Sequence, residues 1–159
     1  MIHLPFFRPI ALALCAGALG MALNGPALAQ AGHDHGQADG HQLVLNQGQK
    51  WATDAPLRQS MARIRELVAP QLDAAHAGKM SAARYQTLAG QTEQQIGVIV
   101  KECKLEPAAD AVLHVVIARM GESLDIMSGK TGGDKEQALV QLARTVNDYG
   151  THFEHPGFR

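Results

Sequence analysis

Aromatic residues, cysteines and an excess of either charge are scarce in this 159-residue sequence. Phe, Trp and Tyr make up 4% of it, which argues against a β-sandwich and against a surface on which nucleic-acid bases stack. Fourteen Lys and Arg residues face fifteen Asp and Glu residues, so there is no excess of positive charge to neutralise phosphates. We therefore expect no nucleic-acid partner.

Motifs of the common enzyme and cofactor classes are missing too. The sequence has no His-Glu-x-x-His, no Glu-x-x-His set for a di-iron centre and no Cys-x-x-Cys-His for covalent haem. Gly129-Lys130-Thr131 is similar to the end of a phosphate-binding loop, but the glycine that such a loop needs five residues earlier is Leu124 here. Without a nucleophile and a base in a recognisable pattern, we expect that the protein is not an enzyme.

Residues 1–29 have the pattern of a secretory signal peptide. Arg8 supplies the positive charge, Ile10 to Leu23 form an apolar run, and Ala27-Leu28-Ala29 forms a small-x-small cleavage site. The run is shorter than the roughly 20 apolar residues that a membrane-spanning helix needs. We therefore predict a periplasmic protein without a membrane span, whose mature chain begins at Gln30.

Residues 30–50, which we name the arm, carry histidines that no hydrophobic core explains. These are His33, His35 and His41, the first two within Gly-His-Asp-His-Gly. Neutral imidazole is a common ligand for copper, nickel and zinc, and the His-x-His spacing lets two nitrogens reach one ion. We expect a flexible, metal-binding arm, with a solvated polar tail as the alternative.

Residues 51–159 are predicted to be all-α, because apolar residues recur there at spacings of three and four. Thr53 or Asp54 caps a first helix, Ser81 caps a second, Pro107 opens a third and Asp134 caps a fourth. The residues predicted to face inward are Leu57, Met61, Ile64 and Val68; Tyr85, Leu88, Thr92, Ile96, Ile99 and Cys103; Leu113, Ile117, Met120, Leu124 and Met127; and Leu139, Leu142, Val146, Tyr149 and Phe153.

Proline and glycine predict where these helices bend and end. Pro70 should kink the first helix, since Leu72 continues its stripe, and Gly78 should stop it. Pro156 and Gly157 should end the fourth helix. Short connections make consecutive helices antiparallel neighbours, so we predict an up-down-up-down four-helix bundle.

This topology brings most of the remaining metal-ligating side chains to the end of the bundle where the arm enters. At about 1.5 Å per residue, Met61 and His114 lie roughly 10 Å in from that end. The predicted group consists of Met61, Cys103, Asp110, His114, His152 and His155. The opposite end has only His76.

Each member of the group also has a structural interpretation. Met61 and Cys103 lie on apolar stripes and can simply fill the core. Asp110, one turn before His114, either orients its imidazole for a metal ion or only satisfies it. His152 and His155 are three residues apart at a helix terminus, where imidazolium complements the helix dipole.

The bundle resembles the cytochrome b562-like and c′-like periplasmic proteins. Leu57-Arg58-Gln59-Ser60-Met61 has the Leu-x-x-x-Met opening of the b562 type, and Asn147-Asp148-Tyr149 is similar to its Asn-x-Tyr. The resemblance implies a haem b held between a methionine early in the first helix and a histidine near the end of the fourth, here Met61 and His152. In that type the histidine directly follows the tyrosine, where this sequence has Gly150.

The chain is also similar to a group of exported bacterial proteins labelled DnrO. These proteins carry the sequence motifs Trp-x-x-Asp-Ala-Pro-Leu-Arg and Phe-x-His-Pro, which residues Trp51–Arg58 and Phe153–Pro156 of this chain match. The label implies no particular activity.

The sequence therefore leads to three hypotheses. The first is a non-catalytic periplasmic protein that binds copper or zinc through the arm and the histidine-bearing end; Met61 or a low-pKa thiolate of Cys103 would favour Cu(I) there. The second is a b-type haem electron carrier with Met61 and His152 as axial ligands. The third is a module that binds another envelope protein or a second copy of itself.

Overall fold

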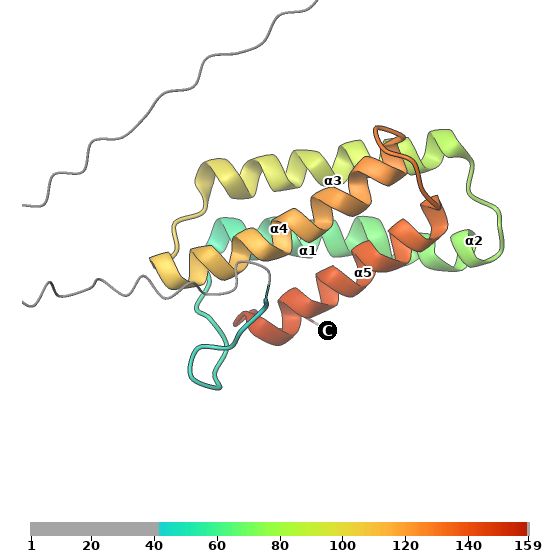
Figure 1. Ribbon diagram of the computed structural model, residues 1–159. Helices are drawn as coiled ribbons and strands as arrows, with labels where there is room; N and C mark the ends of the chain where they lie inside the picture. The colour runs from blue at the N-terminus through green and yellow to red at the C-terminus, as the bar shows by residue number, and fades with distance from the viewer. Residues whose placement is uncertain (1–41, 159) are drawn as a thin grey trace, which may run out of the picture. The chain divides into compact units, whose positions relative to one another are not determined.

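The computed structural model describes residues 42–158, and this part of the chain is all-α (Figure 1). Its helices are α1 (Ala55–Val68), η1 (Ala69–Gln71), α2 (Leu72–His76), α3 (Ala82–Glu102), α4 (Pro107–Ser128) and α5 (Lys135–His152). The predicted signal peptide and the arm histidines His33, His35 and His41 lie outside the described residues. In the described range no helix is long and apolar enough to cross a membrane.

The helices start where the capping residues predicted. Asp54 Oδ1 accepts a hydrogen bond from the backbone N–H of Leu57 at 3.0 Å, and Ser81 Oγ accepts one from Arg84 at 3.3 Å. Asp134 Oδ1 caps α5 in the same way. Each carboxylate or hydroxyl satisfies an N–H that the first turn of a helix leaves without a partner.

The kink at Pro70 is confirmed. The α-helix gives way to the 3₁₀ turn Ala69–Gln71 and resumes as α2, because proline has no N–H to donate to the preceding turn. Gly78 then adopts a φ of 65°, a left-handed conformation that glycine takes without strain. The chain leaves α2 there and turns into α3.

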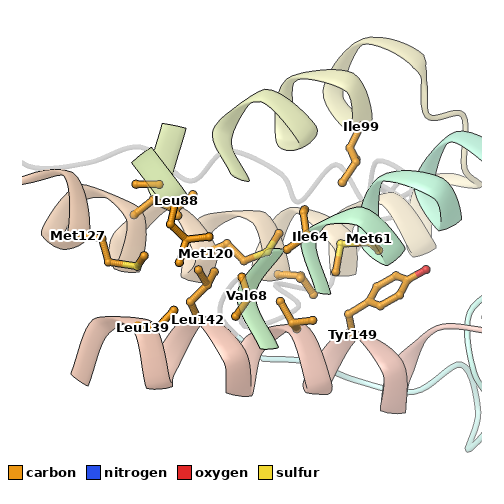
Figure 2. Packing of buried hydrophobic residues seen from close by; sticks show 14 of the residues in the cluster. Met61, Ile64, Val68, Leu88, Ile99, Met120, Met127, Leu139, Leu142 and Tyr149 are labelled. Atoms are coloured by element: carbon orange, nitrogen blue, oxygen red, sulfur yellow. The ribbon is translucent and has the colours of Figure 1, made fainter. Parts of the chain in front are cut away.

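The core lies between the four longer helices. Helix α1 packs against α3 and α5, while α4 packs against α3 and α5. Figure 2 shows the side chains of Ile64, Met120 and Leu142 pointing into this shared interior. All the residues predicted to face inward are buried except Ile96, Cys103 and Ile117, which are half-buried at its margin.

The end of α5 differs from the prediction. The helix ends at His152, well before Pro156, because Phe153 leaves the helix with a φ of −119° and pairs as an isolated β-bridge with Trp51. His155 therefore lies beyond the helix, and the prediction that it shares a helix terminus with His152 is wrong. The bond that ends the helix comes from a segment about a hundred residues earlier in the chain.

Candidate functional site at the arm end of the helices

The two segments that resemble DnrO proteins, Trp51–Arg58 and Phe153–Pro156, are joined by hydrogen bonds. The backbone N–H of Trp51 donates to the carbonyl of His152, and that of Glu154 donates to the carbonyl of Trp51, both at 2.8 Å. The Thr53 hydroxyl donates to the carbonyl of Glu154. We call this set of contacts the clasp; it joins the start of α1 to the end of α5 (Figure 1).

The last residues of the arm are tied to the clasp. Trp51 Nε1 donates to the carbonyl of Val44 at 2.7 Å, and Lys50 Nζ donates to the carbonyl of Gly150 at 2.6 Å. Between them the chain reverses at Gln47 and Gly48, both with positive φ, and Leu43 packs against the core. The last residues of the arm, 43–50, are therefore joined to the folded part of the chain beside the end of α5.

Asp54 joins the start of α1 to the connection between α3 and α4. Its second carboxylate oxygen, Oδ2, accepts a hydrogen bond from the backbone N–H of Lys104 at 2.6 Å. Burial alone would raise the pKa of Asp54, but hydrogen bonds from Lys104, Leu57 and Cys103, with the Arg58 guanidinium, lower this pKa below its ordinary value. Asp54 is thus a fixed negative charge at this end.

Cys103 lies beside this carboxylate. Its half-buried thiol is hydrogen-bonded to Asp54. Burial, the Asp54 carboxylate and the nearby Asp110 carboxylate raise the pKa of Cys103 to about 12. Contrary to our expectation of a low-pKa thiolate, the sulfur is a neutral thiol at physiological pH and a weak metal ligand.

An aromatic cluster closes the end of α5. The fully buried ring of Tyr149 stacks on Phe153 at 5.1 Å between centroids and meets the edge of Phe158, also at 5.1 Å. The Tyr149 hydroxyl and His155 Nδ1 are 3.1 Å apart, a hydrogen bond. Burial, and next the Arg58 guanidinium, lower the pKa of His155, so its imidazole is neutral at pH 7.

His114 is paired with Asp110 as the i, i+4 spacing predicted. Its Nδ1 lies 2.9 Å from the Asp110 carbonyl oxygen and 3.4 Å from the Asp110 carboxylate. The imidazole side chain is 68% exposed. The partner oxygens hold the proton on Nδ1, which leaves Nε2 toward solvent.

Among the predicted ligands within residues 42–158, Met61 alone lies wholly inside the core. Its side chain has no exposed surface. Figure 2 shows Met61 on α1 and Tyr149 on α5 pointing toward the same part of the interior. Its thioether fills the core in this conformation.

These residues share one end of the helices without forming a metal centre of their own. Asp54, Cys103 and Asp110 are near enough to interact electrostatically, and His155 belongs to the aromatic cluster. Among residues 42–158, no group of three or more His, Cys, Asp and Glu side chains is placed to hold a metal ion.

The b562 resemblance implies a histidine directly after the tyrosine, and this chain has Gly150 at that position. A Cβ at position 150, where that type has its histidine, would lie 2.8 Å from Cδ1 of Phe158. The ring of Phe158 thus occupies the place of a side chain at this position. Met61, the methionine that this resemblance would use as an axial ligand, is fully buried in the core.

Sequence reasoning missed several residues that hold this end together. Asp54 was predicted as a cap but not as a partner of Cys103 and Lys104, and Phe158 was not singled out. The DnrO-like motif Trp51–Arg58 could have indicated these residues, because it contains Asp54 together with Trp51 of the clasp.

No family model matches the chain, and no curated protein or solved structure matches it. The resemblances to cytochrome b562-like and DnrO proteins therefore stay predictions.

Proposed function

We propose that this chain is a non-catalytic, exported metal-binding protein that takes up copper or zinc through the arm histidines His33, His35 and His41, next to the histidine-bearing end of the helices. The observation that carries the proposal is the attachment of the arm beside the end of α5, through Trp51 and Val44. We expect the arm histidines to supply the imidazoles, and the hydrogen bond from Trp51 to Val44 joins the last residues of the arm to the folded part.

We further propose that the helices form an up-down-up-down bundle. The contacts of α1 with α3 and α5, and of α4 with the same two helices, support this arrangement. So does the Asp54–Lys104 hydrogen bond, which joins the start of α1 to the second residue after α3. In the predicted bundle both ends belong to the same face.

The ligand chemistry favours Cu(II) or Zn(II) over Cu(I). Cu(I) prefers thiolate and thioether ligands. At this end the Met61 thioether is buried and the Cys103 thiol holds its proton, so neither offers a soft ligand without rearrangement. Neutral imidazoles remain, and they suit copper(II) and zinc.

Isothermal titration of the chain from residue 30 onward tests the proposal. We expect uptake of Cu(II) or Zn(II) tighter than micromolar, which the combined substitution His33→Ala, His35→Ala and His41→Ala abolishes. His76→Ala, a substitution at an exposed site in α2, is the matched control and should bind as the parent does. Absence of uptake by the parent would refute the proposal and leave the third hypothesis, a module that binds an envelope protein or a second copy.

The same preparation tests the haem hypothesis. We expect that added hemin gives no Soret band, because position 150 carries no histidine and Met61 is fully buried. A Soret band with six-coordinate haem would overturn this reasoning and favour the electron carrier.

A further inference from the structure

We propose that a hollow between the last turns of α1 and the residues that follow α5 is a binding site for a small carboxylate with an apolar body. The hollow, which we name the α1 hollow, has a volume of about 340 Å³, within the range of small-molecule sites. The inference goes beyond the proposed function and does not depend on metal binding. The lining residues that matter here are Ala62, Arg65, Ala69, Pro70, His155 and Phe158.

A tight turn after α5 places two rings on one wall of the α1 hollow. The backbone N–H of Phe158 donates to the carbonyl of His155 at 3.1 Å, with Pro156 and Gly157 between them. Gly157 has a φ of 79°, the positive value that the third residue of a type II turn requires, and proline suits the second. The turn holds the rings of His155 and Phe158 4.7 Å apart between centroids.

The Arg65 guanidinium lies over the Phe158 ring, with Cζ 5.2 Å from the ring centroid. This contact uses the face of the guanidinium and leaves the N–H donors in its plane. The side chain is half-buried, yet within residues 42–158 no carboxylate forms an ion pair with it. A guanidinium in this position favours an anion, because its charge-assisted, bidentate hydrogen bonds to a carboxylate are strong.

His155 supplies a second donor on the same wall. The Tyr149 hydroxyl is fully buried and lies 3.1 Å from His155 Nδ1, its one partner among the described residues. Because a buried hydroxyl donates its proton, Nδ1 accepts it, and the neutral imidazole carries its own proton on Nε2. In the part of the chain that the structure describes, no residue accepts a hydrogen bond from Nε2, so this N–H is available to a ligand.

The charges around the α1 hollow suit a single negative charge. Glu66 also lines the hollow, but its carboxylate is paired with Arg63 at 3.0 Å. Burial, and next the Arg58 guanidinium, lower the pKa of His155, so the imidazole brings a donor and no second charge at pH 7. A monocarboxylate therefore neutralises Arg65 and accepts from both donors.

The remaining walls select the rest of the ligand. The side chains of Ala62, Ala69 and Pro70, with the Phe158 ring, present apolar surface beside the two donors. Such walls stabilise an aromatic or aliphatic body and offer it no hydrogen bond.

A larger hollow between α4 and α5, of about 530 Å³, has the opposite character. Three acidic side chains, Glu122, Asp134 and Glu136, line it, against the single cation Arg144. It should repel a carboxylate, so its residues provide controls.

Benzoate is the probe, because it joins one carboxylate to one apolar ring. We titrate the chain from residue 30 onward with sodium benzoate at pH 7 and constant ionic strength, and follow the alanine methyl signals by NMR. The signals of Ala62 and Ala69 should shift saturably, with a Kd on the order of 1 mM for a ligand of this size. The signal of Ala138, which lines the other hollow, should not move.

Two comparison ligands test the two halves of the probe. Benzyl alcohol keeps the ring without the charge, and its Kd should be at least about tenfold higher, because a hydrogen bond to a charged group is lost. Inorganic phosphate keeps the charge without an apolar body and should also bind more weakly than benzoate.

Substitutions assign the binding to named side chains. Arg65→Gln should raise the Kd for benzoate at least about tenfold, and His155→Phe, which keeps a ring but loses Nε2–H, should raise it about threefold to tenfold. Arg144→Gln, at an exposed position in the other hollow, is the matched control and should bind as the parent does. Circular dichroism checks each fold, and Arg65→Lys, which keeps the charge but not the planar fork, replaces Arg65→Gln if that variant unfolds.

Each contrary result overturns the inference. If the Ala62 and Ala69 signals stay fixed at benzoate concentrations about tenfold above the expected Kd, the α1 hollow binds no carboxylate. Equal affinity for benzyl alcohol means that the walls take up any apolar ring, and equal affinity for phosphate means that no apolar body is required. Binding that Arg144→Gln weakens and that both Arg65 variants leave intact belongs to another part of the surface.

Discussion

Gly150 offers a test of how tightly the chain after α5 is packed. Replacing a glycine inside a helix with alanine ordinarily stabilises the fold by about 1 kcal/mol, because alanine loses less backbone entropy. At position 150 the new Cβ would lie 2.8 Å from Cδ1 of Phe158, closer than such atoms approach. The ring must move, and its contacts with Tyr149 and Arg65 weaken.

The magnitude follows from the burial of Phe158. Truncating a fully buried phenylalanine costs about 3–5 kcal/mol. Phe158 is half-buried, so displacing its ring should cost about 1–2 kcal/mol. Since the helical gain offsets most of this loss, we expect Gly150→Ala to change the free energy of unfolding by between about 0 and −1 kcal/mol.

A double-mutant cycle separates the two effects. With Phe158→Ala in place there is no ring to displace, and Gly150→Ala should then stabilise by the full 1 kcal/mol or so. Gly97→Ala is the matched control, because Gly97 is exposed in α3 and a Cβ there meets open space. Urea unfolding followed by circular dichroism measures each free energy. If Gly150→Ala stabilises the parent as much as Gly97→Ala does, Phe158 does not pack on Gly150.

Three further predictions follow from the titrating groups of this end. The pKa of Cys103 is raised to about 12, against 9.0 for an ordinary thiol, so very little reactive thiolate is present at pH 8. Alkylation by iodoacetamide at this pH should be on the order of a thousandfold slower in the folded chain than in the chain unfolded by urea. Equal rates would contradict the contact with Asp54. Because the pKa of His155 is lowered in the folded chain, the unfolded chain binds a proton more readily, and stability should fall as the pH drops below 6.5. His155→Gln should reduce the slope of the free energy of unfolding against pH in this range. An unchanged slope would refute the lowered pKa of His155. Uptake of Zn(II) should weaken steeply between about pH 7 and 5, because imidazole must be neutral to bind; calorimetric affinity that is constant over this range would exclude histidine ligands.

Local features of the sequence predicted local features of the structure. Asp54, Ser81 and Asp134 cap helices because each bonds an N–H two or three residues ahead, which the sequence alone determines. The same holds for the pairing of Asp110 with His114, one turn apart.

What the sequence did not reveal depends on contacts between distant segments. The helix α5 ends at His152 because Phe153 pairs with Trp51, and no residue near Phe153 indicates this. The high pKa of Cys103 likewise comes from burial and from the carboxylate of Asp54, the residue that caps α1. Periodicity assigns a residue to a face of its helix, but it does not identify the partner across the interface.

The clasp also has a consequence for the order of folding. Lys50 is hydrogen-bonded to Gly150 and Thr53 to Glu154, so these bonded residues are 100 and 101 positions apart in the sequence. Contacts between residues so far apart in the sequence form slowly, because closing a long loop costs conformational entropy before the contact can stabilise the fold. During synthesis Trp51 emerges far earlier than Phe153. Lys50, Trp51 and Thr53 are therefore without their hydrogen-bond partners until the end of α5 has been made.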